Sequence, residues 1–220
     1  KLAKKAEAIQ QAVTLAITAK AKEMKENGID VISFSAGEPD FNTPENIIEA
    51  AINAMKNGHT KYTATNGILP LREAICEKLK NDNDLEYKPS QIVVSTGAKQ
   101  SLANTFLAIL NEGDEVILST PYWVTYPELI SLAGGVPVYF NGDKQNGYKY
   151  TKEGLEKLIT NNTKAILLNS PNNPTGSVYS EEELKDIAAL AEKYNLLIVS
   201  DEMYEKLVYG EEKHISIASI

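Results

Sequence analysis

The sequence has little cysteine, little arginine, no excess of positive charge and no long apolar run. Its single cysteine, Cys76, excludes an internal disulfide and fits a reducing compartment. No apolar stretch is long enough to span a bilayer. The charged residues spread through 1–10 argue against a signal peptide. We therefore expect a cytoplasmic protein without a membrane partner.

The acidic balance excludes a further class of partner. The formal net charge is −8, which disfavours nucleic acid as a ligand because phosphate backbones attract basic surfaces. Hydrophobic residues make up 43% of the chain and charged residues 24%, which is ordinary for a globular protein with a buried core. Cys76 falls in an apolar-patterned helix and is interpreted as a packing residue rather than a nucleophile. No metal site is expected.

Arginine is much rarer than lysine in this sequence. Arg72 is the only arginine in 220 residues. Arginine is the preferred bidentate partner of a carboxylate, so an enzyme that binds a substrate acid normally keeps one for that task. Arg72 lies in the helical segment that begins at Pro70, and we expect it to be structural.

The first third of the chain is helical in pattern. Residues 3–26 carry apolar positions at helical spacing and predict one helix or two. Thr43 as N-cap and Pro44 as first residue predict a helix running to about Lys56. A third amphipathic helix is expected from Leu69 to about Lys80.

From there strands and helices alternate, which predicts an α/β fold with a mostly parallel sheet and helices on both faces. The expected strands are 92–95, 115–119, 136–140, 164–168 and 196–200. The expected helices between them are 99–110, 124–132, 152–159 and 181–193, the last capped by Ser180 with Glu183 at position N3. Ligands bind at the carboxyl ends of strands in such sheets, so the loops there are the candidate site.

Two of these loops offer a phosphate cradle and an aromatic face. Ser95 to Gln100 turns from a strand into a helix through small residues, which suits a phosphate at the helix N-terminus. The alternative is a tight turn without a ligand. Trp123 follows the next strand and could stack on a planar ring, or it could simply belong to the core.

Two further loops offer amides and a carboxylate. Residues 169–176 hold so many turn formers that the loop must be sharply fixed, and Asn173 precedes Pro174, where a cis bond costs little. Asp201 ends the last strand, with Tyr204 three residues on. A plain turn and a capping carboxylate are the alternatives at these two places. A phosphorylated, planar, aromatic cofactor with a basic ring nitrogen and a phenolic oxygen would use all four loops. Pyridoxal 5′-phosphate has these properties.

The same residues resemble the class I/II aminotransferases of pyridoxal-phosphate fold type I, and most closely the bacterial aspartate aminotransferase subgroup. The matching motifs follow the family's order: SAGEPDF (35–41), KYTATNG (61–67), STGAKQ (95–100), PYWVTYPE (121–128), NSPNNPTG (169–176) and SDEMYE (200–205). Such enzymes transfer an amino group between an amino acid and a 2-oxo acid. The resemblance implies that 1–40 contributes to a small domain and that 41–220 belongs to the large cofactor-binding domain.

The resemblance also implies roles for single residues. Asp201 matches the catalytic acid that pairs with the pyridine nitrogen, and Tyr204 and Asn173 match the residues at the ring oxygen. Trp123 matches the stacking aromatic. The loop at the phosphate corresponds to Gly97, Ala98 and Lys99.

Substrate and subunit contacts follow in the same way. Gly37, Trp123 and Asn173 match positions at the substrate. A lysine at the position of Lys99 is associated with a distal carboxylate, which implies aspartate as amino donor and an acceptor such as 2-oxoglutarate. Tyr62 matches the tyrosine that reaches the phosphate of a neighbouring subunit, which implies a homodimer with shared active sites.

Other readings stay open. The motifs are shared by aromatic, alanine, prephenate and kynurenine aminotransferases and by β-lyases. A regulatory domain that binds pyridoxal phosphate is a further alternative, although no basic or helix-turn-helix segment precedes residue 30.

The resemblance has one gap. The family's Schiff-base lysine lies in a Ser-x-x-Lys-type segment beyond the strand that follows Asp201, and the 220 residues end before it. Lys206 and Lys213 lack that motif and are interpreted as surface residues. We therefore expect the sequence to be the N-terminal part of a longer enzyme and expect this part to be inactive by itself.

Overall fold

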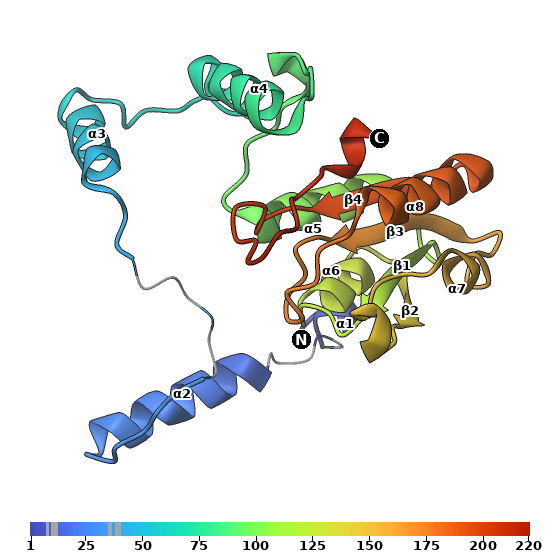
Figure 1. Ribbon diagram of the computed structural model, residues 1–220. Coiled ribbons are helices and arrows are strands. Elements are labelled where there is room, and N and C mark those ends of the chain that lie inside the picture. Colours follow the sequence, from blue (N-terminus) through green and yellow to red (C-terminus); the bar gives the residue numbers. More distant parts are fainter. Residues whose placement is uncertain (8, 10–12, 35–36, 38–40) are drawn as a thin grey trace. The chain divides into compact units, whose positions relative to one another are not determined.

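Strands and helices alternate through most of the chain in the computed structural model, which describes residues 1–220 except 8, 10–12, 35–36 and 38–40 (Figure 1). The helices are α1 Lys4–Glu7, α2 Val13–Glu26, α3 Glu45–Lys56, α4 Leu69–Asn83, α5 Ala98–Ile109, α6 Tyr126–Leu132, α7 Lys152–Glu156 and α8 Glu181–Tyr194. The strands are β1 Glu115–Thr120, β2 Val136–Asn141, β3 Thr163–Asn169 and β4 Leu197–Asp201. Among the described residues, no helix combines the length and apolarity needed to cross a membrane.

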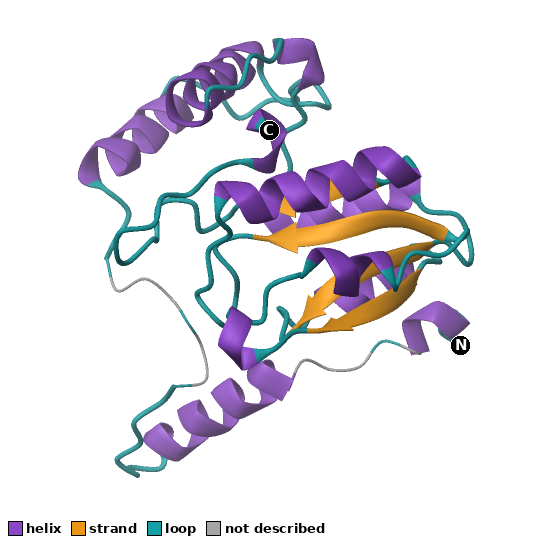
Figure 2. Ribbon diagram, turned by 45° about the vertical axis from the view of Figure 1, so that its right-hand side comes forward, coloured by secondary structure: helices purple, strands orange, loops and turns teal. Residues whose placement is uncertain are grey.

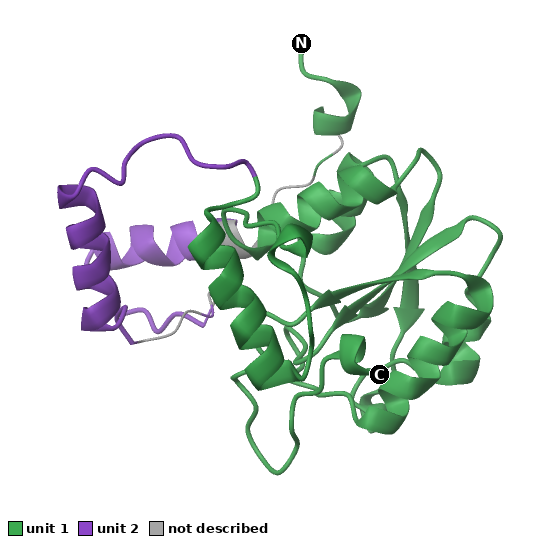
Figure 3. Ribbon diagram, turned by 90° about the horizontal axis from the view of Figure 1, so that it is seen from above, with its two compact units in different colours: residues 1–9, 66–220 green, residues 10–65 purple. Residues whose placement is uncertain are grey.

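The chain divides into two compact units, coloured separately in Figure 3. The larger unit comprises residues 1–9 and 66–220 and holds the sheet. The smaller unit comprises residues 10–65 and holds α2 and α3. This division does not test the domain boundary expected at residue 40, which stays a prediction.

The four strands, drawn in orange in Figure 2, form one parallel sheet. Their order across the sheet is β2-β1-β3-β4. The expected α/β fold with a parallel sheet is confirmed. The register pairs Ile117 with Ile166 in the interior. It also pairs Asn169 with Asp201 at the carboxyl end. Two polar residues from separate strands are thereby placed side by side where the sheet stops.

Both faces of the sheet are covered because neighbouring side chains along a strand point to opposite faces. On one face, α5 and α6 pack on the sheet through a cluster that includes Phe106, Ile130, Val116, Leu118, Ala165 and Leu167. On the other face, α7 and α8 pack through a cluster that includes Leu155, Leu184, Leu190, Ile117, Ile166 and Leu168. The two middle strands are therefore rigidly held, and so are the loops that leave them.

Helix α8 begins as its sequence predicts. The Ser180 side chain accepts a hydrogen bond from the Glu183 backbone N–H, and the Glu183 carboxylate accepts one from the Ser180 N–H at 2.8 Å. This reciprocal capping box satisfies two backbone donors that a helix start otherwise leaves free.

The expected strand at 92–95 is wrong. The segment follows a short 3₁₀ turn at Pro89–Gln91 and is extended, but it joins no sheet in the described part of the chain. Its Val94 N–H instead donates to the Asn66 carbonyl at 3.1 Å. An apolar run shows that a segment can be buried, whereas a strand also needs a neighbouring strand to pair with.

Helix α3 starts one residue later than expected. Pro44 has an extended backbone, with φ −55° and ψ 139°, so it occupies the N-cap position in place of Thr43. The carbonyl of Pro44 accepts the first helical hydrogen bonds, from Ile47 and Ile48. The proline ring fits either position because it lacks the N–H that a helix start leaves unused.

Candidate functional site

A cavity of about 270 Å³ lies at the carboxyl ends of the strands. It is lined by residues from four separate loops: Gly97, Ala98, Lys99, Trp123, Tyr126, Asn173, Asp201, Met203 and Tyr204. The four loops that the sequence predicted to meet at this edge of the sheet therefore do so. For the loops after β1, β3 and β4 this follows from the parallel topology, which places every strand's carboxyl end at the same edge. Residues 97–99 reach the cavity instead at the start of α5, which packs on the sheet.

One wall of the cavity is the start of α5. Gly97 precedes the helix with φ +83°, a conformation that a side chain would strain. The turn brings Ala98 and Lys99, the first residues of the helix, to the cavity. A helix start presents backbone N–H groups that lack intrahelical partners and carries a partial positive charge. This wall can therefore hold an anionic group.

A second wall is aromatic. Trp123 is half-buried and lines the cavity, so its ring is available to a ligand rather than enclosed in the core. The Lys99 ammonium lies 5.1 Å from the centroid of that ring. Tyr126 meets Trp123 edge to face, with ring centroids 5.3 Å apart and planes at 81°. The indole is thereby fixed on one side and carries a cation on its face.

A third wall is built on the buried Asn169. Its side-chain amide donates to the Asp201 carbonyl at 2.9 Å and to the Pro171 carbonyl at 3.2 Å, and its Oδ1 accepts from the Asn173 N–H at 2.9 Å. One buried amide thus joins the end of β3, the end of β4 and the loop between β3 and α8. The bond between Asn173 and Pro174 is cis. Asn173 Nδ2 then donates to the Tyr204 hydroxyl at 3.3 Å, which places these two predicted site residues in contact.

Asp201 supplies the carboxylate of the cavity lining. Its Oδ2 accepts a hydrogen bond from the Tyr126 hydroxyl at 2.8 Å, and its Oδ1 accepts one from the Met203 N–H at 3.1 Å. The second bond is the capping role that the sequence left open, so Asp201 both caps a turn and lines the cavity. Each carboxylate oxygen has two acceptor positions, which leaves capacity for a ligand donor.

Besides Met203, the lining residue that the sequence analysis missed is Tyr126. It is 2% exposed, and burial together with the nearby Asp201 carboxylate raises the pKa of its phenol far above the ordinary value. The phenol therefore stays protonated and can donate its O–H to Asp201. One signal in the sequence could have identified it: Tyr126 is an aromatic residue only three positions after Trp123, near enough for the two rings to meet where α6 begins.

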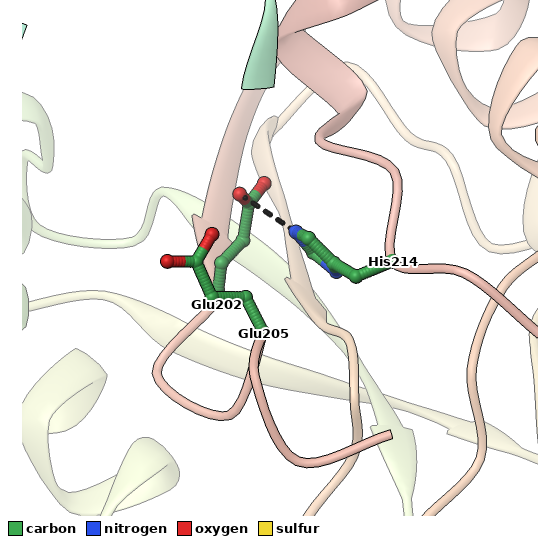
Figure 4. Close-up of side chains that lie close together, drawn as sticks. All are labelled: Glu202, Glu205 and His214. Atoms are coloured by element: carbon green, nitrogen blue, oxygen red, sulfur yellow. Dashed lines mark hydrogen bonds and ion pairs between the residues drawn. The ribbon is translucent and has the colours of Figure 1, made fainter. Parts of the chain in front are cut away.

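Glu202 directly follows β4 but does not line the cavity, and its carboxylate binds other protein groups. Figure 4 shows its carboxylate directed at His214, whose Nε2 lies 3.2 Å from Glu202 Oε2. Its Oε1 accepts from the Ser200 and Ser216 hydroxyls at 2.8 and 2.9 Å. Burial tends to raise the pKa of Glu202, but these hydrogen bonds outweigh burial and hold the pKa below its ordinary value. Glu202 thus stays ionised while it fastens the strand end to a later segment.

Glu205, drawn beside them in Figure 4, also has protein partners. It pairs with the Lys78 ammonium and accepts a hydrogen bond from Asn83 Nδ2 at 3.1 Å. These contacts tie the segment after β4 to helix α4.

Arg72, expected to be structural, and Lys206 and Lys213, expected to be surface residues, are found in those settings. Arg72 donates from Nε to the Gly67 carbonyl at 3.0 Å and from Nη1 to the Pro89 carbonyl at 2.7 Å. Lys206 is exposed and pairs with Asp82 at 2.8 Å, and Lys213 is exposed. None of the three lines the cavity.

Two predicted site residues, Gly37 and Tyr62, lie in the smaller unit. Tyr62 has a fully exposed side chain. Gly37 is exposed, and most of the motif around it, at 35–36 and 38–40, lies outside the described residues. Their roles stay predictions.

Comparison with known proteins gives concordant matches in sequence and structure. The aspartate aminotransferase of Bacillus sp. (strain YM-2) is 58% identical over 219 residues, which is 100% of this chain and 56% of that protein. The probable aspartate/prephenate aminotransferase of Aquifex aeolicus is 55% identical, covering 99% of this chain and 55% of its own length. The chain therefore spans little more than half the length of these relatives.

A solved structure agrees over the whole chain. Aspartate aminotransferase from Thermus thermophilus with maleate superposes with a TM-score of 0.97 at 45% identity, covering 100% of this chain and 57% of that one. The model of the family "Aminotransferase class I and II" matches residues 29–220. These residues include the four loops around the cavity, and the chain belongs to the class I and II aminotransferase family.

Proposed function

We propose that the protein transfers an amino group from an amino acid, aspartate in particular, to a 2-oxo acid such as 2-oxoglutarate, with pyridoxal 5′-phosphate held in the cavity. One observation carries the proposal. Residues from four loops with complementary chemistry meet around a single cavity at the carboxyl edge of the sheet: Gly97, Ala98, Lys99, Trp123, Asn173, Asp201 and Tyr204.

The groups around the cavity fit this cofactor. The N-terminus of α5, at Ala98 and Lys99, would hold the phosphate, since it offers backbone N–H groups and positive charge. Trp123 would stack on the pyridine ring. Asn173 and Tyr204, already in contact at 3.3 Å, would hydrogen-bond the phenolic oxygen of the ring.

Asp201 has the central role in the proposed chemistry. When bound, the cofactor supplies a pyridine ring that accepts negative charge from the substrate α-carbon. The Asp201 carboxylate would keep the ring nitrogen protonated by charge pairing, because an opposite charge nearby favours the protonated form. Its two existing hydrogen bonds, to Tyr126 and Met203, hold it toward the cavity.

The position of Lys99 and the names of the relatives support the proposal that the substrate is a dicarboxylate. The ammonium of Lys99 stands over the Trp123 ring at the cavity, where it could pair with a second substrate carboxylate. The Thermus thermophilus structure carries maleate, a four-carbon dicarboxylate, and several relatives are named aspartate aminotransferases. Gly37, Asn173 and Trp123 are proposed to contact the substrate as well.

We further propose a homodimer in which Tyr62 of one subunit completes the phosphate site of the other. The support is the KYTATNG motif around Tyr62 and its fully exposed phenol, which leaves the hydroxyl available to a partner.

The test is an assay of the full-length protein with pyridoxal 5′-phosphate, 2-oxoglutarate and, in turn, aspartate, alanine and phenylalanine as amino donors. We expect kcat/KM for aspartate to exceed the other two. Faster turnover of alanine or phenylalanine would contradict the dicarboxylate assignment but keep transamination. The relative from Aquifex aeolicus makes prephenate the natural second acceptor to try. Binding of the cofactor without turnover of any donor would favour a regulatory protein and overturn the proposal.

A further inference from the structure

A buried tyrosine contacts two parts of the cavity lining, the Asp201 carboxylate and the Trp123 ring. Tyr126 is the first residue of α6 and is 2% exposed, yet it lines the cavity beside Asp201. Its hydroxyl donates to Asp201 Oδ2 at 2.8 Å, and its ring meets the Trp123 indole edge to face. Tyr126 therefore contacts both the carboxylate and the stacking ring.

The contact fixes the direction of a carboxylate that would otherwise rotate. The two oxygens of a free aspartate side chain exchange places by rotation about one bond, and this bond has a broad, shallow energy profile. In this site, Oδ1 is held by the Met203 N–H and Oδ2 by the Tyr126 hydroxyl. With a donor on each oxygen, the plane of the carboxylate is set before any ligand arrives.

The position of the tyrosine is itself rigid. Its backbone N–H donates to the Trp123 carbonyl at 3.0 Å, and α6 packs on the sheet through the neighbouring residues Leu129 and Ile130. Burial and the Asp201 carboxylate also raise the pKa of the phenol, so it stays protonated and keeps its O–H for Asp201. Tyr126 is thus a fixed donor on a fixed helix.

We propose that Tyr126 is a positioning residue that aims the Asp201 carboxylate at the ring nitrogen of the cofactor, at a fixed angle to the Trp123 ring. The inference rests on the proposed function, because it assumes that a pyridine ring occupies the cavity. Preorganisation of this kind matters because a charge held in place needs no reorganisation when the ligand binds or reacts.

The test compares two ligands that differ at one atom. Pyridoxamine 5′-phosphate carries the ring nitrogen, and its 1-carba analogue has C–H in that place; neither has the aldehyde that reacts with lysines. Calorimetric titration of the full-length protein, before and after Tyr126→Phe, gives four dissociation constants. The matched control is Tyr150→Phe, which removes another buried phenol whose hydroxyl donates to the Leu167 carbonyl at 2.8 Å away from this cavity.

We expect Tyr126→Phe to weaken pyridoxamine 5′-phosphate binding by about tenfold, as for loss of one hydrogen bond to a charged group, and to leave binding of the carba analogue unchanged. The same variant should lower kcat for aspartate while KM changes by less than about twofold, because the substrate's own contacts remain. Tyr150→Phe should lower the thermal midpoint without altering the ratio of the two dissociation constants.

Two results would overturn the inference. Equal weakening of both ligands would show a merely structural role for Tyr126, and no change with either ligand would show no role. A wild-type protein that binds the two ligands equally would instead contradict the pairing of Asp201 with the ring nitrogen, which belongs to the proposed function. The inference and the proposal can therefore fail separately.

Discussion

Asp201 and Asn169 are register partners at the carboxyl end of the sheet, and their side chains have different roles. The Asp201 carboxylate points into the cavity, whereas the Asn169 amide points into the loops and holds them. Sequence reasoning found the first kind of residue, since an acid after a buried strand is visible in one dimension. It missed Tyr126, because the contact of that residue with Asp201 joins positions 75 residues apart.

At this scale we predict that Asp201→Asn in the full-length protein keeps pyridoxal 5′-phosphate bound but lowers kcat by roughly a hundredfold or more, as expected when charge stabilisation in a preorganised site is lost. The asparagine Oδ1 can still accept from the Met203 N–H, and its NH2 can donate to the Tyr126 hydroxyl oxygen, so the fold should be kept. Stopped-flow rates and the cofactor content of the purified variant check this. Normal turnover with full cofactor content would refute the role given to Asp201.

The elements themselves were predictable where their signals are local. Helix α8 was expected at 181–193 and runs from Glu181 to Tyr194. It was predictable because its cap and its apolar spacing depend only on residues that are close in the sequence. The segment at 92–95 has the composition of a strand but pairs with no strand in the described part of the chain, and pairing between distant segments is not a local property.

Ser180 allows a quantitative prediction for an element. Ser180→Ala removes the side chain that caps α8, and we expect the free energy of unfolding to fall by about 1 kcal/mol. Chemical denaturation measures this. The control is Ser131→Ala at an exposed serine inside α6, which should change stability by less than about 0.5 kcal/mol. Equal losses in both variants would argue against the capping box as a source of stability.

The whole molecule depends on pH through groups such as Glu202. Its pKa in the folded protein is lower than in the unfolded chain, so the stabilisation it provides is present above the ordinary carboxyl pKa of about 4.5. As the pH falls below that value toward the folded pKa, Glu202 takes up a proton and this stabilisation is lost. We therefore expect the thermal midpoint to drop in this acidic range.

Glu202→Gln should lower the midpoint at neutral pH and flatten its decline below pH 4.5 or so, since glutamine keeps hydrogen bonds with Ser200 and Ser216 but does not titrate. Calorimetry across the acidic range makes the comparison. Glu112→Gln, at an exposed glutamate, serves as the control and should follow the wild-type curve. An unchanged decline in Glu202→Gln would assign the acid sensitivity to other carboxylates.

Subunit mixing tests the proposed dimer. If each active site combines Asp201 of one subunit with Tyr62 of the other, full-length Tyr62→Ala and Asp201→Ala variants should each be nearly inactive. After they are unfolded and refolded together in equal amounts, random pairing gives one native site in half of the dimers, and activity should recover to about a quarter of wild type. Each variant refolded alone is the control. No recovery in a mixture that does form mixed dimers would mean that the sites are not shared.

The bonds made by Asn169 also bear on the timescale at which the site moves. A surface loop ordinarily exchanges its amide hydrogens with water within a short time, because its N–H groups face solvent. The Asn173 N–H is instead bonded to a buried amide that is itself tied to the ends of two core strands. This hydrogen should exchange only when the end of the sheet opens, so the loop at 169–176 would persist as long as the core does. A ligand entering the cavity would meet a surface that is already in place.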